Sequence, residues 1–205
     1  MPRDKQEVQI KETPRPRWAA KEERILHTAA TLFAQFGYNG VTTREIASSA
    51  EVSEVTLYRH YPRKRDLYLA VLSVELNRVQ LRGELLTRLA EAQNGRVALT
   101  CAFKLISTTL LQQPQLVRLL GFSALELGED VNPLLRRHFG ELVEIVARYL
   151  DPWIARGELR CASARMLILT LAAIVFSRGP LTRVFPGNGA SLDALFEAYS
   201  EFCLP

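Results

Sequence analysis

Apolar residues recur at helical spacing along the chain from Arg24 onward. Residues three and four positions apart share one face of a helix, so this spacing predicts helices that each bury one apolar stripe. Strand signatures are missing, since no alternating run rich in valine, threonine and aromatic residues is closed by an Asn-Gly or Asp-Gly turn. We therefore predict an all-α fold.

The composition is that of a folded protein without a membrane span. Of the 205 residues, 48% are hydrophobic and 23% are charged, a balance that can bury a sizeable core. The longest apolar stretch, Met166 to Phe176, is too short to cross a bilayer, and the first 17 residues lack the apolar segment of a secretory signal. The three cysteines form no C-x-x-C pair. We expect a cytoplasmic protein with reduced thiols.

Start and stop signals divide the chain into about nine helices. The strongest start is at Thr42, which can cap a helix while Glu45 completes a capping box and Val41 and Ile46 form a hydrophobic staple. Gly37 is placed to end the preceding helix. The predicted helices are 18–36, 43–50, 54–60, 63–92, 96–112, 114–127, 132–156, 162–178 and 191–203, and residues 1–17 are predicted to form a flexible arm.

The second and third helices are short and joined by a tight turn, which is the arrangement that places a helix in the DNA major groove. On a helix that starts at Glu54, an outward face holds groups that can read base edges, while Leu57 turns inward. Nearby basic groups and the helix start at Thr42 suit phosphate oxygens. The predicted DNA contacts are Thr42, Thr43, Arg44, Glu54, Val55, Thr56, Tyr58, Arg59, His60 and Lys64.

These side chains could instead form a surface that does not contact DNA. For Arg59, His60 and Lys64 the competing interpretation is a solvated helix face, and Tyr58 could equally be a packing residue. The order and spacing of the whole motif favour DNA contact.

Residues 22–72 resemble the N-terminal DNA-binding domain of the TetR family of bacterial transcriptional regulators. The matching positions, in order and in register, are Arg24-Ile25-Leu26, Ala29-Ala30, Leu32-Phe33, Gly37, Thr42-Thr43, Ile46-Ala47, Val52-Ser53, Thr56-Leu57-Tyr58, His60-Tyr61, Lys64 and Leu67. The resemblance implies a helix-turn-helix domain over residues 18–62 and a helical ligand-binding and dimerisation domain over residues 63–205. It also implies a homodimeric repressor that binds double-stranded operator DNA and is released by a small effector.

Two positions depart from the family pattern. Glu51 stands in the turn where the family usually has glycine, so either Glu51 takes a left-handed conformation at a cost of roughly 1 kcal/mol or the turn differs slightly. Val55 also replaces a usual glycine, and its side chain either contacts a thymine methyl group or holds the backbone away from the groove.

The resemblance also implies a dimer interface and an effector pocket in the larger domain. The last two helices carry more apolar residues than a monomer core needs. The interface is predicted to involve Leu167, Leu171, Ile174, Val175, Leu192, Leu195, Phe196 and Tyr199. For the pocket, the candidates are Phe103, Ser107, Phe122, Glu126, Phe139, Tyr149 and Trp153, each of which could instead be ordinary core. Few charges on the central helices favour a mostly apolar or aromatic effector.

Two other classes of function compete with this hypothesis. An enzyme is disfavoured because the sequence has no G-x-S-x-G, H-E-x-x-H, P-loop or glycine-rich phosphate motif, and we predict no cofactor. His138 and Glu141 are half of a possible metal site whose second half is missing, so no metal is predicted. A helical adaptor that no longer reads DNA is the second rival, suggested by Glu51, Glu54 and Val55.

Overall fold

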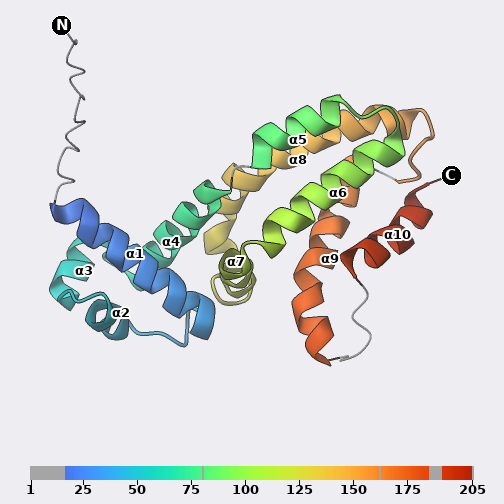
Figure 1. Cartoon of the computed structure of the whole chain (residues 1–205). Helices are drawn as coiled ribbons and strands as arrows, with labels where there is room; N and C mark the ends of the chain where they lie inside the picture. The colour runs from blue at the N-terminus through green and yellow to red at the C-terminus, as the bar shows by residue number, and fades with distance from the viewer. Residues whose placement is uncertain (1–16, 80, 162, 185–190, 205) are drawn as a thin grey trace, which may run out of the picture.

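The computed structural model describes residues 17–79, 81–161, 163–184 and 191–204, and every regular element within these ranges is a helix (Figure 1). The elements are α1 (Arg17–Phe36), α2 (Thr43–Ser49), α3 (Glu54–His60), α4 (Lys64–Arg78), α5 (Leu81–Ala90), α6 (Gly95–Leu111), α7 (Pro114–Glu126), the 3₁₀ helix η1 (Gly128–Val131), α8 (Asn132–Ala155), α9 (Ala164–Val184) and α10 (Leu192–Cys203). The predicted all-α fold is confirmed. The predicted arm lies outside the described residues, apart from Arg17.

The helix predicted over 63–92 is present as two helices, α4 and α5. α4 ends at Arg78, although neither glycine nor proline stands there. The break lets the two halves pack into different cores, since Leu72 of α4 is buried with α1 and Leu85 of α5 is buried with α6 and α8. Gly83 does not cause the bend, because it lies inside α5 with open space around it.

Two large clusters of buried residues organise the molecule. The first joins α1, α2, α3 and α4 to α7 and η1, and the second joins α5, α6, α8, α9 and α10. Figure 1 shows α1, α2 and α3 grouped at one end and α10 at the other, with α4 leading from the first group to the rest. The domain boundary at residue 62 stays a prediction, and the first cluster extends beyond it through α4 and α7.

No helix among the described residues is long and apolar enough to cross a membrane. The three cysteines are free thiols, with Cys203 buried and Cys101 and Cys161 partly exposed. Burial raises the pKa of the Cys203 and Cys161 thiols, so both are held in the protonated form at neutral pH.

Candidate nucleic-acid interface

The capping box that the sequence predicts at the start of α2 is formed. The Thr42 N–H donates to Glu45 Oε2 over 2.7 Å, and the Glu45 N–H donates to Thr42 Oγ1 over 3.2 Å. Val41 and Ile46 are both buried beneath it. The hydrogen bonds from Thr42 hold the pKa of the Glu45 carboxyl below its usual value. The start of α2 is therefore fixed by several independent contacts.

The turn between α2 and α3 contains the strained residue that the sequence suggested. Glu51 has a φ of +53°, so it occupies the left-handed region that favours glycine. The turn closes when the Val52 N–H donates to the Ala47 carbonyl over 2.9 Å. Ser53 then caps α3 by accepting from the Thr56 N–H over 3.1 Å. Of the two alternatives for this turn, the structure contains the left-handed glutamate.

Hydroxyl groups of α2, α3 and the N-cap of α3 form hydrogen bonds with one another. The Tyr58 and Thr43 hydroxyls lie 2.8 Å apart, and so do the hydroxyls of Thr56 and Ser53. Tyr58 therefore ties α3 to α2 while remaining partly exposed. The Tyr58–Thr43 contact helps to fix the orientation of α3 on α2, and the Ser53–Thr56 contact lies within the cap of α3.

The outer face of α3 presents one apolar and one cationic side chain, one helical turn apart. Val55 is 79% exposed, whereas Leu57 on the opposite face is buried against α2. Arg59 and, on α2, Arg44 are both exposed, and neither has a hydrogen-bond or ion-pair partner within the part of the chain that the structure describes. His60 and Glu54 flank this face, with His60 exposed and Glu54 partly buried. The arrangement offers a methyl-bearing group and two free guanidinium groups to a partner.

Lys64 has a different environment from the free arginines. Its Nζ atom lies 4.4 Å from the centre of the Tyr38 ring, a cation–π geometry, and the side chain is half-buried. Burial lowers the pKa of Lys64, and the carboxylates of Glu126 and Glu45 oppose that shift. Its phosphate contact stays a prediction, and its packing on Tyr38 is a structural role that the sequence did not indicate.

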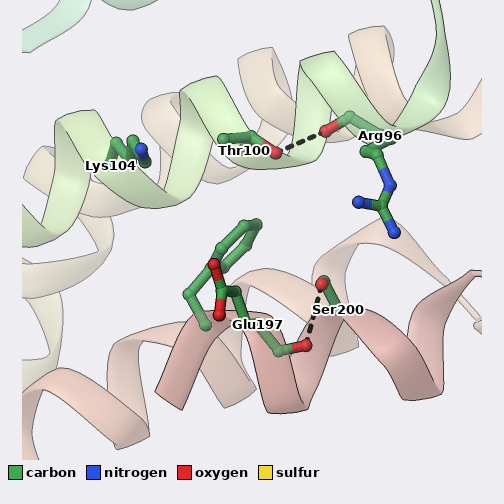
Figure 2. Close-up of a pocket in the computed structure, with 6 residues that line it drawn as sticks. Arg96, Thr100, Lys104, Glu197 and Ser200 are labelled. Atoms are coloured by element: carbon green, nitrogen blue, oxygen red, sulfur yellow. Dashed lines mark hydrogen bonds between the residues drawn. The ribbon is translucent and has the colours of Figure 1, made fainter. Parts of the chain in front are cut away.

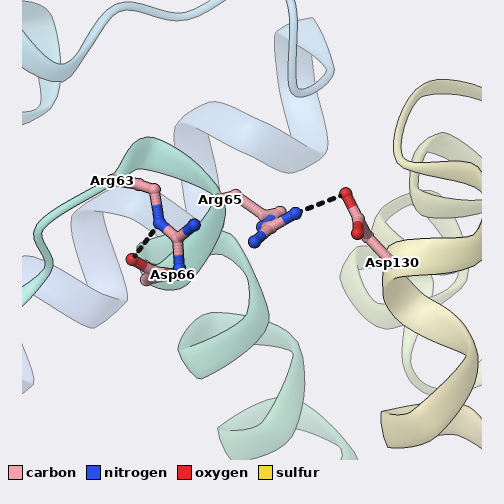
Figure 3. A network of polar contacts seen from close by, with 4 residues as sticks. All are labelled: Arg63, Arg65, Asp66 and Asp130. Atoms are coloured by element: carbon pink, nitrogen blue, oxygen red, sulfur yellow. Dashed lines mark hydrogen bonds and ion pairs between the residues drawn. The ribbon is translucent and has the colours of Figure 1, made fainter.

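Three polar contacts join the Asn39 backbone and α4 to α7 and η1. The Asn39 N–H donates to Glu126 Oε2 over 2.6 Å, and Arg65 pairs with Asp130 over 2.7 Å (Figure 3). The buried Tyr68 hydroxyl donates to the carbonyl of Leu119, also over 2.6 Å. All of their acceptors lie on α7 or η1. Sequence reasoning missed these contacts because the partners are 51 to 87 residues apart.

A cavity of about 920 Å³ lies among α4, α5, α6, α7, α8 and α9. Its walls are mostly leucine and other apolar residues, with Asn77, Arg82, Thr109, Arg137, His138 and Glu141 as the polar groups. Its volume lies in the range that holds drug-sized ligands. A second pocket, of about 180 Å³, lies between α6 and α10 and is lined by Arg96, Thr100, Lys104, Phe196, Glu197 and Ser200 (Figure 2).

The structure does not bring the predicted pocket residues together. Phe139 lines the large cavity. The six others lie elsewhere: Phe103 and Ser107 are buried in α6, Phe122 and Glu126 face Gly37, and Tyr149 and Trp153 pack against the second cluster. Most of the actual lining is aliphatic, and no sequence signal separates a leucine that lines a cavity from one that fills a core.

The predicted dimer residues divide into three groups. Leu167 and Phe196 are buried within the chain's own core, where the ring of Phe196 stacks on that of Phe103 at 4.5 Å. Ile174, Leu195 and Tyr199 are half-buried. The side chains of Leu171, Val175 and Leu192 lie outside the described residues. Among the described side chains of these two helices, the large apolar ones that are exposed are instead Met166, Leu169 and Phe202.

Residues 25–71 match the family model described as bacterial regulatory proteins, tetR family. Parts of the chain are also similar to proteins named as transcriptional regulators. The HTH-type transcriptional regulator RutR of Escherichia coli strain K12 is 43% identical over 54 residues, which are 26% of each chain. The uncharacterised HTH-type transcriptional regulator YuxN of Bacillus subtilis is 25% identical over 144 residues, which are 66% of this chain but 49% of that protein. The chain therefore spans about half the length of that relative.

Solved structures resemble the whole arrangement of helices. A protein from Saccharomonospora viridis, crystallised in complex with choline, aligns over 91% of this chain and 99% of its own with a TM-score of 0.62. The sequences are 21% identical, so this likeness concerns the fold.

Proposed function

Because the chain belongs to the TetR family of bacterial regulatory proteins, we propose that it is a sequence-specific DNA-binding transcriptional regulator. In this proposal the protein acts in the cytoplasm as a homodimeric repressor. It leaves its operator when a small, mostly apolar or aromatic effector binds in the larger helical domain.

The observation that carries this proposal is the outer face of α3. Val55 and Arg59 are exposed on it, Arg44 lies beside it on α2, and the polar groups behind it are already hydrogen-bonded to each other. Arginine can donate two hydrogen bonds to guanine, and an apolar side chain can contact a thymine methyl group. A face of this kind suits the base edges in the major groove.

The homodimer is supported by exposed apolar side chains near the end of the chain. Met166 and Leu169 on α9 and Phe202 on α10 are each more than half exposed. Large apolar groups on a surface favour a protein interface. Two-fold symmetry would then present two copies of α3 about 34–36 Å apart, one turn of DNA.

Release by an effector is supported by the position of α7. One side of α7, at Leu120 and Ala124, lines the large cavity, while its end at Glu126 contacts the Asn39 backbone before α2. A ligand that binds one arrangement of α7 more tightly than another would shift the position of α2 and α3. The choline complex of the structural relative is a further reason to expect a small ligand in this fold.

The test is selection of double-stranded DNA from a random pool with the purified protein. We expect a palindromic site with half-sites about one helical turn apart. Arg59→Ala should lose specific binding of that site. Arg136→Ala removes the same charge from an exposed position on α8 and should retain it. If no sequence is enriched, the regulator hypothesis is wrong and the adaptor function becomes the better explanation.

A further inference from the structure

The described side chains that form the buried end of the large cavity are apolar. Ile106 and Leu110 of α6, Leu116 and Leu120 of α7, and Ile168 of α9 line it, and all five side chains are buried. None of these side chains offers a hydrogen bond. A ligand that fills this end must therefore present an apolar body to it.

Most of the polar groups lie at one edge, where the junction of α4 and α5 faces α8. Asn77 and Arg82 come from the junction, and Arg137, His138 and Glu141 come from α8. Among the described residues that line the cavity, two arginines and one glutamate carry formal charge, which leaves one net positive charge with His138 neutral. This edge of the cavity attracts anions.

Among the charged groups that the structure describes at this edge, one is available to a ligand. Arg82 donates to Glu141 over 2.8 Å, so these two charges compensate each other. His138 is held between the Asn77 side chain and the Leu134 carbonyl, both at 3.0 Å. Arg137 has no ion-pair or hydrogen-bond partner anywhere in the described part of the chain. Its guanidinium group is therefore the free donor next to an apolar cavity.

A cationic ligand would find less to bind in the same cavity. Recognition of an ammonium group uses an unpaired carboxylate or the faces of aromatic rings, of which tryptophan binds best and tyrosine and phenylalanine follow. The described lining contains neither tryptophan nor tyrosine, its aromatic residues are Phe139 and Phe176, and its single carboxylate is paired with Arg82.

We propose that the effector of this cavity is an anionic amphiphile, with an apolar body in the buried end and one carboxylate-sized head bound by Arg137. A guanidinium group can hold a carboxylate through two parallel hydrogen bonds, which suits a single head at the edge of an apolar site. This proposal rests on the effector part of the proposed function and specifies its chemistry.

The test compares three probes with the same tail and different heads: decanoate, 1-decanol and decyltrimethylammonium. Their dissociation constants for the full-length protein are measured by calorimetry without DNA. We expect decanoate to bind about tenfold more tightly than either other probe, the ratio that corresponds to one hydrogen bond between charged groups. Arg137→Ala should raise the dissociation constant of decanoate about tenfold and leave that of 1-decanol unchanged.

Arg136→Ala is the matched control, because Arg136 is the neighbouring exposed arginine on α8 and does not line the cavity. It should bind decanoate as the original protein does. Equal loss in both variants would mean that overall charge, and not the site, attracts the head. Tighter binding of decyltrimethylammonium, equal binding of all three probes, or no binding would each overturn the proposal. Operator selection with the same protein remains a separate measurement, so failure here is distinguishable from failure of the regulator hypothesis.

Discussion

Glu51 is an unusual residue at the point where the direction of α3 is set. Its φ of +53° is a conformation that glycine adopts without strain and that other residues avoid. Its side chain is 81% exposed and reaches Arg24 at 3.5 Å, a surface contact that contributes little to stability. The backbone cost is therefore largely uncompensated by this contact.

We predict that Glu51→Gly raises the free energy of unfolding by about 1 kcal/mol, because glycine relieves the strain. Glu51→Ala removes the same charge but keeps a Cβ atom in the left-handed region, so it should give no comparable gain. Denaturant unfolding of the two variants distinguishes the effect of backbone strain on stability from the effect of the lost charge. Equal stabilisation in both would contradict the explanation based on φ.

Val55 is predicted to contact a thymine methyl group in the selected operator. Replacing that thymine with deoxyuridine removes one methyl group and should weaken binding about fourfold, the value of one buried methyl group. The Val55→Ala variant should be less sensitive to the same replacement. Affinities measured with deoxyuridine at each thymine in turn test this. A scan in which no position matters would show that Val55 does not read a methyl group.

At the scale of the element, the start of α2 depends on an ionised side chain. The hydrogen bonds from Thr42 lower the pKa of Glu45 in the folded state below its unfolded value. A group of this kind stabilises the fold above its unfolded pKa, and that contribution is lost as the pH falls through the folded pKa.

We therefore expect the unfolding free energy to fall as the pH is lowered from about 5 toward 3, and Glu45→Gln to show a shallower fall over the same range. Denaturant unfolding at several pH values provides the measurement. The same slope in both proteins would mean that other carboxylates account for the acid sensitivity.

Gly37 ends α1 and also allows α7 to approach. Its φ is +81°, and a Cβ atom there would lie 2.7 Å from Glu126 Oε1 and 3.1 Å from the Phe122 ring. We predict that Gly37→Ala lowers the free energy of unfolding by more than about 1 kcal/mol, since strain and steric overlap both oppose it. Gly83→Ala, in the open space along α5, should instead raise it by about 0.5–1 kcal/mol. Thermal melting of both variants tests the pair, and a loss of stability from both would refute this account of α5.

At the scale of the whole molecule, the sequence predicts local features well and long-range contacts poorly. The caps at Thr42 and Ser53 depend on neighbouring residues, so they could be predicted. The left-handed alternative at Glu51 came from the resemblance to a family that usually has glycine there. The division between α4 and α5 could not be predicted, because it results from burial in two separate clusters. Likewise, no local pattern indicates that the Asn39 backbone meets Glu126, 87 residues away.

The residues of the α3 face could also be predicted from the sequence, whereas those of the cavity could not. The outer face of α3 follows from helical spacing, and Val55 and Arg59 are exposed as predicted. The aromatic pocket candidates are dispersed because aromatic residues also fill cores, and Phe103 does so. The cavity is lined mainly by aliphatic residues from separate helices, whose convergence only the packing determines.

Whether the protein reads a DNA sequence is tested by its affinity for the selected duplex and for a scrambled duplex at two salt concentrations. We expect a specificity ratio of roughly 10³ or more, together with a loss of affinity as salt increases, because phosphate contacts release counterions. Equal affinity for both duplexes at each salt concentration would contradict this expectation.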